Sequence, residues 1–183
     1  PLRGEQCAQL PSLLPSLTRL TCDMWESSDF ASLSLFSTFL HLRDLTLRSL
    51  LTVSDIDVSR SLTVAEEKLL PALKQSTQLT NLSLFSFALT SAQIKEIMPC
   101  VTQLQKLSLI GMDQMESLRF LSRGSITRTL THLTLQECDH PNLHTTELQH
   151  VHALKELRAF NILQSFVEPL DPALLLVYSQ PYS

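Results

Sequence analysis

Leu79-Thr80-Asn81-Leu82-Ser83-Leu84 contains the pattern that decides the fold, a leucine followed by leucines three and five positions later. Six blocks of this kind occur along the 183 residues, two of which end in cysteine or alanine instead of leucine. They start at residues 17, 42, 79, 104, 130 and 154 and read LTRLTC, LRDLTL, LTNLSL, LQKLSL, LTHLTL and LKELRA. Four of the five intervals between starts are 24–26 residues, and this regularity predicts a chain of repeated structural units.

Each block predicts a short β-strand with one apolar side. Leu82 and Leu84 are two residues apart, so their side chains point to the same side of a strand, while Asn81 and Ser83 point to the other. One such strand cannot bury its leucines, but a stack of six can bury them in a continuous core. Because parallel strands need crossover connections, the pattern predicts an α/β fold with a parallel sheet.

The segments between blocks predict the crossovers. Thr90 and Gln93 have capping-box spacing, and apolar residues follow at helical spacing: Ile94, Ile97, Met98 and Val101. A second capping box begins at Thr63, and a third helix is expected between Asp113 and Gly124. The long interval of 37 residues between the second and third blocks leaves about 12 extra residues near 49–62, which we expect to form a protruding insertion.

We interpret residues 1–183 as one domain. Residues 1–16 are expected to be an N-terminal cap or the tail of a preceding repeat, which indicates a fragment of a longer protein. Residues 17–162 hold the repeats, and residues 163–183 form a C-terminal cap because Pro169, Pro172 and Pro181 break the pattern.

Composition excludes several function classes. The net charge is −4 and the pI about 5.8, which argues against nucleic acid as a partner. Only three glycines occur, so loops that cradle phosphate groups are not expected. No apolar run has membrane-spanning length. The four cysteines are scattered and unpaired in pattern, which is typical of reduced thiols in an intracellular protein of the cytoplasm or nucleus.

The six blocks resemble those of leucine-rich repeat proteins over residues 10–163. This resemblance implies a solenoid, with a curved parallel sheet on its concave side and helical or irregular segments on its convex side. Cys100 ahead of LQKLSL, and Cys138 after LTHLTL, resemble the cysteine-containing repeats of F-box leucine-rich repeat proteins. In that family the repeats recruit substrates to a cullin-type ubiquitin ligase, whereas nothing in this chain matches the F-box itself. The alternative is an extracellular or innate-sensing ligand-binding domain.

Histidines and acidic residues crowd into 138–152 and raise the question of a metal site. Zinc sites need converging nitrogen and sulfur ligands, and the spacing of these residues matches no zinc template. His140–Thr146 instead reads as a loop. No serine or cysteine nucleophile lies in a recognisable turn. We therefore expect no metal, no cofactor and no catalytic activity.

The side chains between the inward leucines are the candidate partner-binding residues. The last exposed position of each block would be occupied by Asp23, Arg48, Phe85, Ile110, Gln136 and Phe160. Apolar and basic side chains on an exposed strand surface are typical of protein-binding hot spots, although packing of the apolar ones under the rim is the alternative. The sequence thus predicts a protein partner bound by Arg48, Phe85, Lys106, Ile110, His132, Gln136, Arg158 and Phe160.

Overall fold

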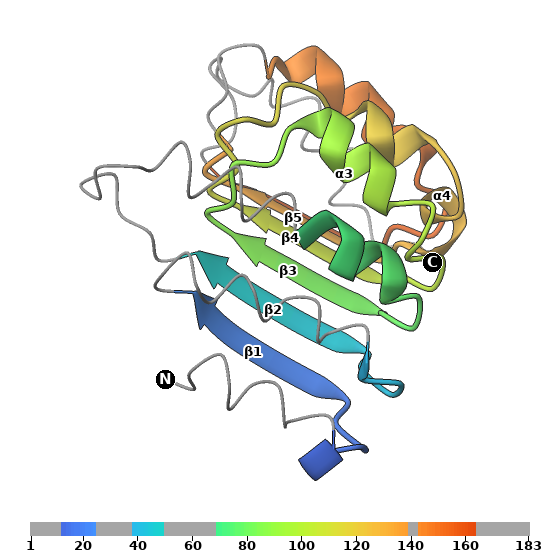
Figure 1. The fold of residues 1–183 in the computed structure, drawn as a ribbon. Coiled ribbons are helices and arrows are strands. Elements are labelled where there is room, and N and C mark those ends of the chain that lie inside the picture. Colours follow the sequence, from blue (N-terminus) through green and yellow to red (C-terminus); the bar gives the residue numbers. More distant parts are fainter. Residues whose placement is uncertain (1–11, 25–37, 50–68, 139–142, 164–183) are drawn as a thin grey trace, which may run out of the picture.

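A computed structural model describes residues 12–24, 38–49, 69–138 and 143–163. Within these ranges, six strands form one sheet in which every neighbouring pair is parallel and the spatial order follows the sequence (Figure 1). They are β1 (Arg19–Met24), β2 (Asp44–Ser49), β3 (Asn81–Phe85), β4 (Lys106–Ile110), β5 (His132–Gln136) and β6 (Ala159–Leu163). The predicted α/β class with a parallel sheet is confirmed.

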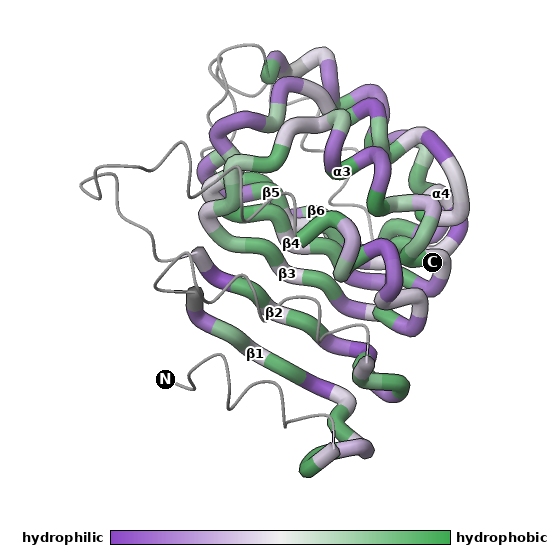
Figure 2. The backbone as a smooth tube through the Cα atoms, viewed as in Figure 1, coloured by the Kyte–Doolittle hydropathy of each residue, from purple (hydrophilic) through white to green (hydrophobic). Residues whose placement is uncertain are grey.

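Neighbouring strands pair without any stagger. Leu45 of β2 lies beside Leu82 of β3, which lies beside Leu107 of β4. These leucines and those two positions later are at most 1% exposed. The leucine pairs of the blocks therefore align into two apolar rows that form the buried side of the sheet. Figure 2 shows hydrophobic residues recurring along the neighbouring strands.

The strand starts share one hydrogen-bond pattern. The carbonyl of Arg43 accepts bonds from two successive N–H groups, those of Thr80 at 2.8 Å and Asn81 at 2.9 Å. Carbonyls at the equivalent position precede the other strands and accept the same two bonds: those of Thr18, Thr80, Gln105 and Thr131. This repeated contact fixes the register where each strand begins.

Within the described residues, three strands are followed by a residue with left-handed backbone. Ser86, Gly111 and Glu137 follow β3, β4 and β5, with φ values of 57°, 65° and 53°. Each donates its N–H to the last carbonyl of the next strand; Ser86, for example, bonds to Ile110 at 2.8 Å. The chain then turns back over the apolar side, where the next residue is fully buried: Phe87, Met112 and Cys138.

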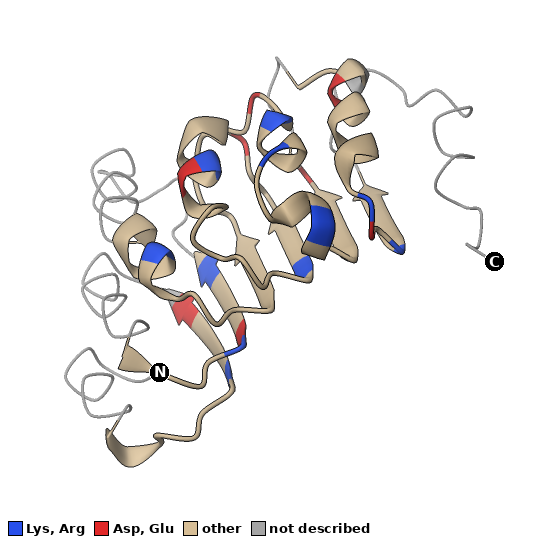
Figure 3. Ribbon diagram, turned by 90° about the vertical axis from the view of Figure 1, so that its right-hand side faces the viewer, with Lys and Arg blue, Asp and Glu red and all other residues tan. Residues whose placement is uncertain are grey.

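Helical segments lie over one side of the sheet and leave the other side uncovered by described residues (Figures 1 and 3). Residues 69–75 are helical, and α3 (Ser91–Ile97) begins with the predicted capping box of Thr90 and Gln93. The uncovered side is called the open face below.

The third predicted helix is wrong. Residues 115–118 lack regular structure, a 3-10 helix η2 (Arg119–Ser122) follows, and a short helix α4 (Ile126–Thr129) comes only after Gly124. Gly124 does end η2, with a φ of +72° two residues beyond it.

The loop expected at His140–Thr146 is only partly present. Residues 139–142 lie outside the described part, but the 3-10 helix η3 (Thr145–Ala153) already begins at Thr145. Glu147 on η3 accepts hydrogen bonds from Ser117 and Leu118 and thereby holds η3 against the start of η2.

Several expectations concern residues outside the described ranges. These are the insertion near 49–62, the capping box at Thr63, and most of the terminal segments 1–16 and 163–183. They stay predictions.

Candidate functional site

The open face carries three rows of side chains that cross all six strands in register. The carboxyl-end row consists of Asp23, Arg48, Phe85, Ile110, Gln136 and Leu163. The middle row consists of Thr21, Thr46, Ser83, Ser108, Thr134 and Asn161, and the amino-end row of Arg19, Asp44, Asn81, Lys106, His132 and Ala159. Small polar side chains in the middle row separate two rows of larger ones.

The carboxyl-end row begins with three side chains in contact. The guanidinium of Arg48 lies 5.2 Å from the centre of the Phe85 ring, within cation–π range. Its Nη1 is also 3.8 Å from Oδ1 of Asp23, and both side chains are more than 40% exposed. An exposed cation–π contact contributes about 0.5–1 kcal/mol, so Arg48 orients Phe85 without removing the ring from solvent.

Beyond Phe85 the row continues with apolar and amide side chains. Phe85 and Ile110 are adjacent in register and half-buried, as is Gln136, whose amide donates to Glu137 at 3.0 Å. Leu163 ends the row and is 55% exposed. The row therefore presents apolar surface from three strands on the side of the sheet away from the core.

The position predicted for the sixth block is wrong. Phe160 pairs with Leu133, and Ile162 with Leu135, so both occupy inward positions. Phe160 is partly buried against the core instead of facing outward in the carboxyl-end row. The reason is that the block is LRAFNI, starting at Leu157, in which phenylalanine and isoleucine replace two leucines. Leu154, which mimics a block start, is itself buried three residues earlier.

The position predicted for Arg158 is also wrong. It immediately precedes β6, where its N–H bonds to the carbonyl of Thr131 at 2.8 Å, and its side chain is exposed. It thus lies at the amino end of the sheet, near Lys106 and His132, and not beside the carboxyl-end row.

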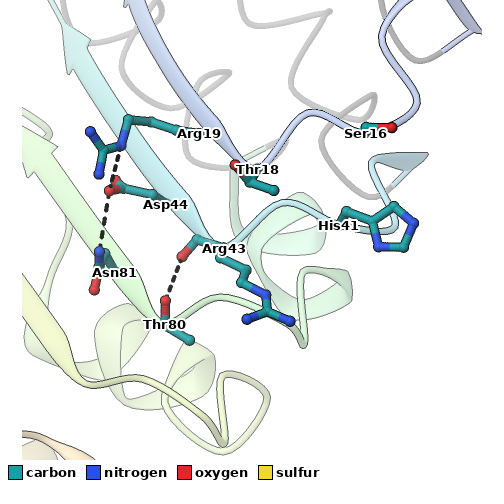
Figure 4. A pocket seen from close by; sticks show the side chains of 8 residues that line it. All are labelled: Ser16, Thr18, Arg19, His41, Arg43, Asp44, Thr80 and Asn81. Atoms are coloured by element: carbon teal, nitrogen blue, oxygen red, sulfur yellow. Dashed lines mark hydrogen bonds and ion pairs between the residues drawn. The ribbon is translucent and has the colours of Figure 1, made fainter.

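Two grooves of similar size lie along the amino ends of the strands. The first, of about 630 Å³, lies between the starts of β1, β2 and β3 (Figure 4). There Oδ2 of Asp44 accepts hydrogen bonds from Arg19 at 3.0 Å and from Asn81 at 3.2 Å. The carboxylate therefore balances one cation of this groove.

The second groove, of about 680 Å³, lies between the starts of β4, β5 and β6. Its charged lining consists of Lys106, Arg128, Arg158 and Glu156, with His132 beside them. Nδ1 of His132 lies 2.8 Å from Oγ1 of Thr131. Figure 3 shows basic positions at this edge of the sheet, where the strands begin.

Within the described residues, one histidine of the segment 138–152 lies close to a carboxylate, and no group of three or more His, Cys, Asp or Glu side chains is placed to hold a metal ion. Nε2 of His150 is 3.7 Å from Oε2 of Glu147. His144 and His152 lie on or beside the same helix, whereas Asp139 and His140 fall outside the described ranges. Burial raises the pKa of Glu147, but hydrogen bonds from Ser117 and Leu118 and the charges of His150 and Arg119 outweigh it, so the pKa is lowered.

Three of the four cysteines, Cys22, Cys100 and Cys138, lie in the described part of the chain. Cys22 occupies a leucine position beside Leu47 as predicted, but it is only half-buried because β1 is the edge strand. Cys138 is fully buried, and its thiol contacts the carbonyls of Leu109 and Gln136.

Two residues of these surfaces are not predicted by the sequence pattern. Leu163 would have entered the carboxyl-end row had the sixth block been read from Leu157. Arg128 reaches the second groove from α4, in a crossover whose sequence has no periodic signal pointing to the open face.

No family model of known proteins matches this chain, and no curated protein matches it in sequence. Within the described ranges, the helices are too short or too polar to cross a lipid bilayer.

Proposed function

We propose that this chain is a leucine-rich repeat solenoid that binds a protein partner on its open face and has no catalytic role. The repeat assignment is supported by six leucine blocks, by strands that pair in sequence order without stagger, and by one hydrogen-bond pattern at every strand start. A finer proposal, substrate recognition in an F-box type ubiquitin ligase, is supported by the sequence resemblance around Cys100 and Cys138.

The observation that carries the binding proposal is the pair of Phe85 and Ile110. They are neighbours in register on the outward side of β3 and β4, where burial contributes nothing to the core below. Arg48 stacks on Phe85 at 5.2 Å. Aromatic, aliphatic and arginine side chains grouped in this way are the residues that dominate protein interfaces.

The chemistry of the open face supports binding more than catalysis. Its middle row offers hydroxyl groups of serine and threonine, and within the described residues no hydrogen bond joins them to a histidine or carboxylate that could act as a base. General acid–base catalysis needs such a group within hydrogen-bond reach. We infer that these small side chains let a partner approach the sheet closely.

The test is capture of partners with the wild-type chain, followed by titration of a captured partner against purified variants. Phe85→Ala and Ile110→Ala should each weaken binding by about thirtyfold, as truncation of a hot-spot residue does. Leu40→Ala is the matched control, because Leu40 is an apolar side chain that is 76% exposed but lies in the turn before β2, outside the three rows.

The thermal melt of each variant separates binding from folding. A folded Phe85→Ala variant that binds as tightly as wild type would refute the open face as the binding surface. A variant that unfolds would place Phe85 in the core, and the proposal would then fail on its structural premise.

A further inference from the structure

The second groove is a candidate ligand site distinct from the carboxyl-end row. Lys106 begins β4 in the groove, whereas Ile110 ends β4 in the row. Four residues of extended chain span about 13 Å, so the two surfaces lie at opposite ends of the same strands. A ligand of the groove can therefore be tested independently of the proposed partner.

Three cations reach this groove from three separate parts of the chain. Lys106 is the first residue of β4 and Arg128 belongs to α4, while Arg158 immediately precedes β6. The register places Lys106 beside His132 of β5. The backbone bond from Arg158 to Thr131 fixes the start of β6 in the same way as at the other strands. The fold itself thus brings these charges to one place.

The charges of the groove are left unbalanced by the described residues. Lys106, Arg128 and Arg158 are exposed, and none of them forms an ion pair within the described part of the chain. Glu156 is the one carboxylate among the described residues that line the groove. In the first groove, by contrast, Asp44 pairs with Arg19 at 3.0 Å (Figure 4). An anionic ligand would relieve the like-charge repulsion that remains in the second groove.

We propose that the second groove binds an acidic peptide segment, whose negative charges are carboxylates or a phosphorylated serine or threonine. Arginine and lysine clusters recognise such motifs through charge-assisted hydrogen bonds. Thr131 and the amide side chains of Gln103 and Gln105 line the same groove and can bond to a peptide backbone.

A peptide accounts for the groove better than a nucleic acid does. The whole chain has a net charge of −4, which repels a long polyanion. Among the described lining residues there is no phenylalanine, tyrosine or tryptophan to stack on a base, although such stacking platforms are usual in sites for single strands. Glu156 would repel a continuous phosphate backbone, whereas it can accept a peptide N–H or pair with a basic side chain.

The experiment is fluorescence anisotropy of labelled peptides with the full chain. Three peptides share one neutral framework: one with several glutamates, one with a phosphothreonine, and one with glutamine in their place. A labelled single-stranded oligonucleotide of equal charge is the fourth probe. We expect the two anionic peptides to bind and to weaken as salt is raised, and the glutamine peptide not to bind. The ratio of their affinities identifies which anion the groove prefers.

Substitutions then locate the site. Lys106→Ala combined with Arg158→Ala should weaken peptide binding at least tenfold, and Arg128→Ala alone should weaken it severalfold. Lys95→Ala is the matched control, because Lys95 is an exposed lysine of α3 on the helical side. Phe85→Ala should leave peptide binding unchanged even if it abolishes binding of the open-face partner.

Several outcomes would overturn the inference. Equal binding of the glutamine peptide, an unchanged affinity in folded Lys106 and Arg158 variants, or a loss shared by Lys95→Ala would each do so. Tighter binding of the oligonucleotide would replace the peptide by a nucleic acid. A peptide signal that disappears with Phe85→Ala but persists in the groove variants would place the acidic ligand on the carboxyl-end row instead.

Discussion

The hydroxyl of Ser117 donates a hydrogen bond of 2.6 Å to the carboxylate of Glu147, which lies 30 residues later in the chain. The same oxygen accepts the N–H of Leu118 at 3.0 Å, where η2 is about to begin. Glu147 therefore acts as a cap supplied by another crossover. Because both bonds favour the ionised carboxylate, this contact links protonation to the packing of the helical side.

We expect the link to appear as acid sensitivity. The pKa of Glu147 is lowered from its ordinary value of 4.5 in the folded state, so its contribution is fully present above that pH and is lost as the pH falls through the lower, folded-state pKa. Urea unfolding midpoints measured from about pH 7 down to about pH 3 should fall more steeply for wild type than for Glu147→Gln.

Glu96→Gln is the control for this prediction. A hydrogen bond from Lys74 and the charge of Lys74 lower the pKa of Glu96, but that pair is on the surface. Exposed pairs contribute little to stability, so this variant should keep nearly the acid sensitivity of wild type. Equal changes in both variants would show that the Glu147 contact has no special role.

Leu107→Ala and Ser108→Ala test which side of β4 is buried. Leu107 is 1% exposed in the core, and its truncation should cost about 2–5 kcal/mol of unfolding free energy. Ser108 faces the open side, and its truncation should cost less than about 0.5 kcal/mol. Denaturant unfolding measures both, and similar losses would contradict the two-sided sheet.

Gly111→Ala should destabilise the protein more than Gly124→Ala. Both glycines have positive φ, +65° and +72°, so an alanine is strained at either position by about 1 kcal/mol. At Gly111 the new Cβ would also lie 3.0 Å from Oγ of Ser86, whereas nothing lies within 4 Å at Gly124. Thermal melts compare the two variants. Adding Ser86→Ala should recover part of the Gly111→Ala loss, and no recovery would exclude the clash.

Phe160 and Leu163 should respond in opposite ways. Phe160 packs against the core, so Phe160→Ala should lower the unfolding free energy by about 2 kcal/mol. Leu163 is 55% exposed at the end of the carboxyl-end row, so Leu163→Ala should leave the melting temperature nearly unchanged and lower the affinity for a partner bound on the open face. A melt unaffected by Phe160→Ala would restore the outward position that the sequence pattern first predicted.

The sheet was predictable because a leucine followed by leucines three and five positions later indicates both the strand and the side of the strand that is buried. Five blocks are in the predicted register, and α3 follows from local capping at Thr90 and Gln93. The register of the sixth block was predicted wrongly because Phe160 and Ile162 occupy the inward positions that leucines occupy in the other blocks, and the leucine pattern does not include phenylalanine or isoleucine. The helix predicted from Asp113 is wrong: the helical segment η2 begins only after Leu118, whose N–H donates to the carboxylate of Glu147, a residue distant in sequence.

The candidate site was predictable to the same extent as the register. The contact of Arg48 with Phe85 follows once β2 and β3 are aligned, because the two residues are register partners. The charge of the second groove was not predictable, since it depends on how α4 and the start of β6 pack beside Lys106. Local patterns do not determine such contacts between segments distant in sequence.

The unstaggered pairing of the strands also bears on how this protein can change during evolution. A segment from one strand start to the next, such as residues 106–131, could be lost or duplicated, and the flanking strands would still find equivalent partners. The carbonyls before the strands, which each accept two N–H groups, would form the same bonds with the start of the new neighbouring strand. Each event would remove or add one column of three outward side chains while the remaining columns kept their neighbours. A gene encoding this chain can thus lengthen, shorten or rewrite its surface one column at a time.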